Sequence, residues 1–518
     1  MTKNTPIGWR ALCTALWLSA ALPAAGAPAA ERIEATLTVT QEAAGPLIEP
    51  AVYGQFAEHL GTGVYGGLWV GPESTVPNTR GWRNDVVAAL RRIQVPVVRW
   101  PGGCFADDYD WRDGIGPPDK RPARLNKVWG NVLETNHVGT HEFMDLMEQI
   151  GADAYLAGNM GSMPPRAMSQ WLEYMTSDTR SALAEERRRN GREQPWKVKY
   201  FGVGNESWGC GGRMRPEFAA DLHRQYAQFL RAPTLRVASG DGEGNDRITE
   251  LMMERAKDDM DALTLHHYTV PGTWEAKGRA AGFDAQRWAK TMQDVVVGTE
   301  EHIARTIRIM DRHDPAKRVA LYVDEWGMWH DPEPGTNGAF LYQQNTLRDA
   351  MVAALSFGVF HRYTERVKMA NIAQMVNVLQ ALVLTDGPRM LLTPTYHVFD
   401  MYQPFKGATP LQATLQTLPY REGSIELAAV HASVARGADG ATVVALVNID
   451  PVRPARVATN LAAAARGRVL GATAMDAHNS FERPDAVTPA PYAAAPSGGR
   501  LTLDLPPRSI VVVTVPAR

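Results

Sequence analysis

The sequence predicts an α/β protein built on a TIM (β/α)8 barrel, with a C-terminal antiparallel β-sandwich domain that is jelly-roll-like. From residue 48 to residue 395, short apolar runs alternate with longer stretches whose apolar residues recur at helical spacing. From 396 to 518, strand-like runs follow one another closely, and no helix-length amphipathic stretch lies between them. At 518 residues, the chain is long enough for two such domains.

Eight apolar runs are expected to form the barrel strands, because each run ends in polar residues before an amphipathic stretch begins. Helices are expected at 84–94, 140–151 and 217–231. An open doubly wound sheet is the alternative fold, but it usually binds through a glycine fingerprint, and GVGNES lacks the third glycine at that spacing. The eight runs are AVYGQFAEH, VPVVRWPGGC, ADAYLAGNMG, VKYFGVGNES, LRVASGDG, DALTLHHYT, VALYVDEWG and VKMANIAQM.

Two further segments belong to the expected β-domain organisation. RIEATLTVT at 32–40 has the pattern of a strand, so residues 31–47 are predicted to join the sandwich. PAPYAAAPSGG at 489–499 is rich in Ala, Pro and Gly and is predicted to be an exposed loop. The expected sandwich strands lie within SIELAAVHASVA, ATVVALVNID, ARVATNL, GRVLGATAM and RLTLDLPPRSIVVVTVPAR.

Residues 1–30 are predicted to be a secretory signal peptide. Lys3 and Arg10 precede the apolar stretch ALCTALWLSAALPAA, and AGAPAA then supplies small residues for cleavage. The apolar stretch is too short to anchor the chain in a bilayer. We therefore expect an exported protein, periplasmic or extracellular, with no membrane partner.

Charge and cysteine content narrow the classes of partner. With 54 basic and 56 acidic residues, the formal net charge is −2, which does not favour a nucleic-acid partner. Cys13 lies in the predicted signal. Cys104 and Cys210 lie in glycine-rich loops, where they could form a disulfide or be small buried residues, since pairing depends on geometry. No Cys/His cluster predicts a metal, and no motif predicts an organic cofactor.

The strand ends carry side chains suited to carbohydrate chemistry. In a TIM barrel, the carboxyl ends of the strands form the active-site face. Two carboxylates are the minimum for glycoside hydrolysis, and Glu206 and Glu325 end the fourth and seventh expected strands, on opposite sides of the barrel mouth. Carboxyl groups ~5–5.5 Å apart would retain the anomeric configuration, whereas ~6.5–9.5 Å would invert it. The polar residues expected at this face are Glu58, Arg99, Asn159, Asn205, Glu206, His266, His267, Tyr268, Asp324, Glu325 and Gln374.

Several long motifs in fixed order closely resemble glycoside hydrolase family 51, the α-L-arabinofuranosidases. The resemblance implies a retaining, exo-acting hydrolase that releases terminal non-reducing α-L-arabinofuranosyl residues from arabinan, arabinoxylan or their oligosaccharides. A β-xylosidase or an endoglucanase on the same scaffold, and a non-catalytic carbohydrate-binding protein, are the alternatives. The family also suggests a homo-oligomer. The motifs are GQFAEHLGTGVYGGLWVG, VVRWPGGCFADDYDWRDGIGP, NHVGTHEFMDLMEQIGA, FGVGNESWGCGG, LYVDEWGMW and VKMANIAQMVNV.

The same resemblance implies roles for individual residues. Glu206 would be the general acid/base and Glu325 the nucleophile, which Arg99 would hold in place. Asn205 would bind the sugar hydroxyl next to the anomeric carbon. Cys104 stands where some relatives have asparagine, so its contact with substrate would be weaker. The remaining substrate-binding residues that the resemblance implies are Glu58, His266, Tyr268, Gln374 and Trp129, the last as a wall near the leaving group.

Overall fold

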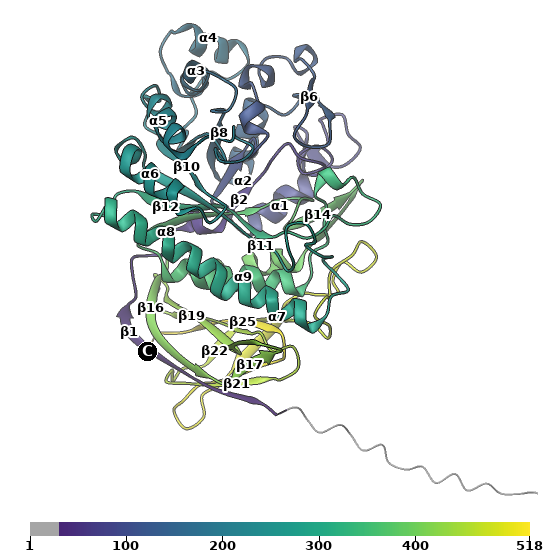
Figure 1. Cartoon of the computed structure of the whole chain (residues 1–518). Helices are drawn as coiled ribbons and strands as arrows, with labels where there is room; N and C mark the ends of the chain where they lie inside the picture. Colours follow the sequence, from purple (N-terminus) through teal and green to yellow (C-terminus); the bar gives the residue numbers. More distant parts are fainter. Residues whose placement is uncertain (1–30, 518) are drawn as a thin grey trace, which may run out of the picture.

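The computed structural model describes residues 31–517, with an α/β barrel above a β-domain in Figure 1. The expected TIM barrel is confirmed, because eight parallel strands close on themselves in the order β10-β11-β12-β13-β2-β5-β8-β9. Each of the eight apolar runs contributes one strand. In chain order these strands are β2 (Gly54–Phe56), β5 (Val97–Trp100), β8 (Asp153–Gly158), β9 (Tyr200–Val203), β10 (Leu235–Asp241), β11 (Ala262–Thr269), β12 (Ala320–Met328) and β13 (Val367–Ala373).

The barrel interior is filled by side chains at one level, so the cavity that holds polar groups lies above this floor. The strands are apolar because both of their faces are covered, and β9 is buried at every position. Seven of the eight strands contribute one residue each to the floor: Val97, Tyr155, Tyr200, Val237, Ala262, Tyr322 and Met369.

Amphipathic helices surround the barrel, and the helices expected at 84–94, 140–151 and 217–231 correspond to α1, α2 and α5. The first turn of α2 is closed by the Gly139 N–H, which donates to Glu142 Oε2 at 2.9 Å. The helices are α1 (Asn84–Arg92), α2 (Thr140–Ile150), α3 (Pro165–Thr176), α4 (Ala182–Arg189), α5 (Pro216–Ala227), α6 (Asp246–Ala256), α7 (Ala285–Gln293), α8 (Thr299–His313), α9 (Leu347–Arg362) and α10 (Pro394–Met401).

The β-domain is the second unit, and α9 lies between it and the barrel (Figure 1). Its order is β23-β22-β25-β20-β19-β16-β1-β21-β24. The strand β16 joins the part of the sheet that runs from β23 to β19 to the part that contains β1, β21 and β24. It pairs with β19 at Thr409–Pro410 and with β1 beyond that point. The strands are β1 (Ile33–Ala43), β16 (Thr409–Thr417), β19 (Val430–Arg436), β20 (Thr442–Asn448), β21 (Ala455–Thr459), β22 (Ala465–Gly471), β23 (Ala490–Ala494), β24 (Thr502–Leu505) and β25 (Ser509–Val515).

Two details of the β-domain differ from the expectation. The sheet is mostly antiparallel, but β1 runs parallel to β21. The segment 489–499 is not wholly a loop, because β23 pairs with β22 at the edge of the sheet. Pro491 lacks an N–H, which an edge strand tolerates because only one of its sides is paired.

Among the described residues, four short hairpins lie outside the barrel and the large sheet. The domain limits at 47/48 and 395/396 stay predictions. The last barrel strand ends at Ala373, and the first strand of the β-domain after it begins at Thr409. Within residues 31–517, no helix is long and apolar enough to cross a bilayer. The hairpins are β3 (Asn78–Thr79) with β4 (Trp82–Arg83), β6 (Arg124–Asn126) with β7 (Val132–Glu134), β14 (Val383–Asp386) with β15 (Arg389–Leu392), and β17 (Pro419–Glu422) with β18 (Ile425–Ala428).

Candidate active site

Two carboxylates from opposite sides of the barrel meet above its floor. Glu325 lies in β12, and Glu206 lies in the loop that follows β9. One carboxylate oxygen of each, together with a ring nitrogen of His266, lies within 4.8 Å of the others. Carboxylate oxygens this close are consistent with the carboxyl–carboxyl distance of retaining glycosidases, ~5–5.5 Å.

Glu325 is held at both carboxylate oxygens. Arg99 Nη1 donates to Oε1 at 2.7 Å, and the Tyr268 hydroxyl donates to Oε2 at 2.7 Å. Gly103 lies so close that a Cβ there would stand 2.7 Å from Oε1, which explains why this position has no side chain. A buried carboxylate with charge-assisted hydrogen bonds at both oxygens is fixed in direction.

Arg99 connects the second, fourth and seventh barrel strands. Besides Glu325, its guanidinium donates from Nη2 to Asn205 Oδ1 at 2.6 Å, and its Nε lies 3.3 Å from Asp324 Oδ2. Burial works against the cation, but Asp324 and then Glu325 hold the pKa of Arg99 above its ordinary value. The guanidinium therefore remains charged and fixes the nucleophile candidate relative to Asn205.

His266 lies among three carboxylates. Its Nδ1 is 2.9 Å from Glu206 Oε1 and 3.6 Å from Glu325 Oε2, and its Nε2 is 3.2 Å from Asp324 Oδ1. Burial alone would lower the pKa of His266, but Glu325, followed by Asp324 and Glu206, raises it to about 10. The imidazole is therefore a cation at neutral pH and donates from both nitrogens.

Glu206 sits in a strained loop and is more open than Glu325. Its backbone has φ of 35°, in the left-handed region that non-glycine residues seldom adopt. The loop closes on it, because Gly209 N and Gly211 N both donate to the Glu206 carbonyl, at 2.7 and 3.1 Å. The exposed fraction of its side chain is 18%, against 8% for Glu325. A carboxylate with this access can meet both a substrate and water.

Glu58 follows β2 and faces the same cavity. Its Oε1 accepts the N–H of Gly103 at 3.1 Å and of Phe105 at 3.0 Å, and its Oε2 accepts from Gln374 Nε2 at 3.1 Å. Burial, followed by the charge of Glu325, raises the pKa of Glu58 to about 7. Glu58 has two acceptor oxygens, and near pH 7 its carboxyl group can also carry a proton. It can therefore both accept hydrogen bonds from sugar hydroxyls and donate one.

Three other residues expected at the site differ in position: Trp129 packs at the site, whereas Asn159 and His267 make their contacts away from the two glutamates. Trp129 is half-buried and packs with Phe56 and Leu60, while its buried indole nitrogen has no hydrogen-bond partner among the described residues. Asn159 uses its amide to brace loops through Tyr109 O and Ser162. His267 points away, with its Nδ1 3.2 Å from His302 Nδ1.

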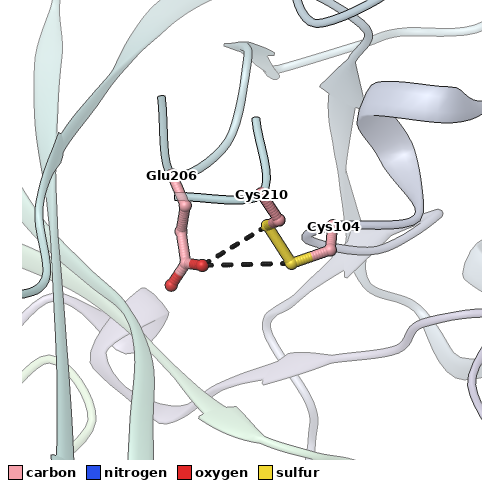
Figure 2. Close-up of side chains that lie close together, drawn as sticks. All are labelled: Cys104, Glu206 and Cys210. Carbon is pink, nitrogen blue, oxygen red and sulfur yellow. Dashed lines mark hydrogen bonds between the residues drawn. A yellow bond between two sulfur atoms is a disulfide. The ribbon is translucent and has the colours of Figure 1, made fainter. Parts of the chain in front are cut away.

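Cys104 takes part in a disulfide, one of the two states that the sequence left open. It is bonded to Cys210, which lies 106 residues further along the chain, so it has no S–H to offer a substrate (Figure 2). The sulfurs border the site, because both lie near Glu206 Oε2. Sequence reasoning left this pairing open, since only the folded chain brings the two loops together.

Asp107 is a site residue that the sequence analysis missed. It lies in a short 3-10 helix (Ala106–Asp108) and accepts the backbone N–H groups of Met160, Gly161 and Asn205 at 2.9–3.0 Å. It thereby fixes Asn205 from behind the site. The FADDYD motif gave no signal, because two consecutive aspartates look alike until one is buried.

The sequence analysis listed Asp324 only as a polar residue at a strand end. In the structure it contacts both cations of the site, Arg99 and His266. Its Oδ2 also accepts the Tyr155 hydroxyl at 2.8 Å. Burial opposes its ionisation, but Arg99 and then His266 hold the pKa of Asp324 below its ordinary value. A permanent charge beneath the cavity thus orients the groups that contact Glu325 and Glu206.

Comparison with known proteins gives one consistent result. The model of the α-L-arabinofuranosidase C-terminal domain matches residues 324–509, and that of the α-L-arabinofuranosidase 1 domain matches residues 89–287. A relative from Bacteroides ovatus, named intracellular exo-α-L-arabinofuranosidase, is 45% identical over 96% of this chain and 99% of its own length.

Solved structures agree with this result. The GH51 arabinofuranosidase from Xanthomonas axonopodis pv. citri is 50% identical, covers 93% of this chain and 99% of its own, and has a TM-score of 0.91. The arabinose complex of the Thermotoga maritima α-L-arabinofuranosidase is 26% identical over 93% of this chain and 99% of its own, with a TM-score of 0.81.

The comparisons also correct the expected location. The near full-length relative from Bacteroides ovatus is named as intracellular, which overturns the prediction of a periplasmic or extracellular protein. That prediction rested only on the composition of residues 1–30, which lie outside the described residues, and an apolar stretch at the start of a chain is not specific to export. Identity over nearly the whole length, the shared barrel and β-domain, and the facing glutamates agree on one assignment: the chain belongs to the α-L-arabinofuranosidases of glycoside hydrolase family 51.

Proposed function

We propose that this family 51 α-L-arabinofuranosidase uses Glu325 as its nucleophile and Glu206 as its general acid/base. The observation that carries the proposal is the approach of the two carboxylates, which have oxygens within 4.8 Å of one another. Their surroundings support the division of roles. Glu325 has both oxygens fixed by cation and hydroxyl donors, whereas Glu206 is the more open of the two. A nucleophile needs fixed direction, and an acid/base needs access.

The proposed reaction is a double displacement. In the first step, Glu325 attacks the anomeric carbon while Glu206 gives its proton to the departing oxygen, which leaves the sugar bonded to Glu325. In the second step, Glu206 accepts a proton from water, and the resulting hydroxide attacks the same carbon and frees Glu325. Two inversions restore the original configuration. Arg99 and Tyr268 hold the carboxylate on line for attack and receive it again when it leaves.

The substrate is proposed to be a terminal, non-reducing α-L-arabinofuranosyl residue on arabinan, arabinoxylan or their oligosaccharides. Asn205 supports this, because Arg99 fixes its carbonyl oxygen, and its amide nitrogen has only a long 3.6 Å contact, to Cys210 Sγ, which the neighbouring sugar hydroxyl could replace. Glu58 and Gln374 supply acceptor and donor groups on the far side. Trp129 supplies an aromatic wall. A homo-oligomer remains a prediction.

Azide tests both roles at once. In Glu325→Ala, turnover of an aryl α-L-arabinofuranoside should be lost, and azide should restore it with formation of the β-glycosyl azide. In Glu206→Ala, azide should instead yield the α-glycosyl azide, because it attacks the covalent intermediate on Glu325. Glu301→Ala, an exposed position on α8, is the control and should keep full activity. Full activity in Glu325→Ala, or the same azide from both variants, would show that the roles are assigned wrongly.

Substrate class is tested separately with three compounds. Aryl α-L-arabinofuranoside should be hydrolysed much faster than aryl β-D-xyloside or a soluble β-glucan. Faster hydrolysis of either of the other two would overturn the proposed substrate and leave the two-carboxylate chemistry intact.

A further inference from the structure

The Cys104–Cys210 disulfide joins the two loops that carry the catalytic machinery on one side of the barrel mouth. Cys104 follows β5, immediately after Gly103, whose N–H binds Glu58. Cys210 lies in the loop after β9, four residues beyond Glu206 (Figure 2). The bond therefore ties the end of the second barrel strand to the end of the fourth, directly beside the proposed acid/base.

The loop that this bond closes holds Glu206 in a conformation it would not adopt alone. The residue has φ of 35°, and such strained positions persist only where the surroundings impose them. Two backbone hydrogen bonds to the Glu206 carbonyl, from Gly209 and Gly211, impose it from within the loop. The disulfide at Cys210 is the covalent restraint that fixes the same loop to its neighbour.

The sulfurs also define the surroundings of one carboxylate oxygen. Glu206 Oε1 faces His266 at 2.9 Å, whereas Oε2 lies 3.5 Å from Cys210 Sγ and 3.9 Å from Cys104 Sγ. A disulfide sulfur carries no hydrogen, so neither contact is a hydrogen bond while the bond is intact. Among residues 31–517, no N–H or O–H donates to Oε2. This oxygen is therefore free to carry the proton that the leaving group receives.

We propose that the disulfide is a positioning element for the acid/base, and that its reduction by a dithiol impairs proton transfer to the leaving group. The inference rests on the proposed role of Glu206. Reduction gives each cysteine an S–H that can donate to Oε2, which favours the ionised carboxylate and occupies the oxygen that must hold the proton. It also frees the Cys210 loop, so the carboxylate loses its fixed position.

The dithiol supplies the electrons and protons that reduction of the Cys104–Cys210 disulfide requires. Cys210 is exposed, so a reductant thiolate can attack its sulfur and displace the Cys104 thiolate, which takes up a proton. The second reductant thiol then attacks the mixed disulfide and releases Cys210 as a thiol. Two electrons and two protons pass to the protein, and the reductant leaves as a cyclic disulfide. The other titratable groups that face Glu206 are His266, Glu325 and Tyr268.

The test compares the oxidised full-length enzyme with the same enzyme treated with dithiothreitol. Thiol titration should show two additional thiols after reduction. For an unactivated disaccharide, whose leaving oxygen needs a proton, kcat/KM should fall by about tenfold or more. For a 2,4-dinitrophenyl arabinofuranoside, whose leaving group needs none, it should change less than about twofold. The alkaline limb of the disaccharide profile should also move to lower pH, and reoxidation should reverse every change.

Cysteine variants distinguish the effect of the Cys104–Cys210 disulfide from the effect of the third cysteine, Cys13. Cys13→Ser should respond to reduction like the parent enzyme. The Cys104→Ala/Cys210→Ala double variant should hydrolyse the disaccharide slowly and ignore dithiothreitol. If two new thiols appear while both rates stay constant, the inference is wrong. If both substrates slow equally without a shift of the pH profile, the bond is only a structural brace and the inference is also wrong. If Glu206→Ala shows no dependence on the leaving group, the proposed acid/base role fails instead.

Discussion

The stability contributed by protonated His266 should decline as the pH rises from 6.5 to about 10. The side chain is buried among Glu325, Asp324 and Glu206, which together raise its pKa to about 10 against the opposing effect of burial. Replacing it by glutamine removes the positive charge, so that Asp324 and Glu325 keep Arg99 as the cation that contacts them and Glu206 loses its only ion pair among the described residues. The variant should therefore be less stable than the parent wherever His266 is charged.

The sign and size follow from proton linkage. Because the folded-state pKa is higher than the ordinary value of 6.5, the contribution is fully present below pH 6.5 and is lost as the pH approaches 10. One pKa unit corresponds to about 1.4 kcal/mol, so the full contribution is on the order of 5 kcal/mol, of which roughly 3 kcal/mol remains at pH 8. The difference between the parent enzyme and His266→Gln should shrink accordingly.

Thermal unfolding at pH 7.5, 8.5 and 9.5 measures this difference, and comparing two proteins at each pH cancels the titrations of groups that do not contact His266. His267→Gln is a matched control, because it changes the neighbouring histidine, which is half-buried and lies outside the group of carboxylates. Burial, followed by His302, lowers the pKa of His267 to about 3, so it is neutral throughout this range. Its difference from the parent should be constant. A constant difference for His266→Gln, or an equal decline in both variants, would refute the reasoning.

Two further predictions concern the fixed position of Glu325. Tyr268→Phe removes the hydroxyl that donates to Glu325 Oε2 at 2.7 Å. A hydrogen bond to a charged group is worth about 1.5–3 kcal/mol, so kcat/KM on an aryl arabinofuranoside should fall about 10- to 100-fold. A loss below threefold would contradict this role. Gly103→Ala places a Cβ 2.7 Å from Oε1 and should reduce kcat strongly, whereas Gly338→Ala, with no atom within 4 Å of the added carbon, should keep the parent rate. Equal rates in the two alanine variants would show that the close approach does not matter.

The barrel and its two glutamates could be predicted because both are encoded locally. Apolar runs that end in polar residues mark strand ends, and barrel closure then brings the ends of the fourth and seventh strands together. Glu206 and Glu325 follow from that geometry alone. The strand β16 was not expected, because TPLQATLQT has exposed residues over much of its length and lacks a clear apolar run.

Two supports of the site, Asp107 and the disulfide, could not be predicted, because they depend on distances between segments far apart in the sequence. Asp107 and Asp108 are adjacent and chemically identical, but the fold buries Asp107 and exposes Asp108. Only Asp107 therefore receives the three backbone N–H groups that hold Asn205 and its neighbours. The disulfide is similar, since cysteines 106 residues apart meet only when β5 and β9 take their places in the barrel.

The charge balance of the cavity links these contacts to the proposed reaction. The carboxylates Glu206, Asp324 and Glu325 contact two cations, Arg99 and His266, and the charges of Glu325 and Arg99 also act on the nearby Glu58. Asp324 and Glu325 are matched by those cations, so the cavity is neutral overall when Glu58 and Glu206 each carry a proton. Glu58 can do so near pH 7, and the proposed mechanism requires a protonated Glu206 when the glycosidic bond breaks. Protonated His266 therefore adds to Arg99 the second positive charge that the proposed mechanism needs between Glu206 and Glu325.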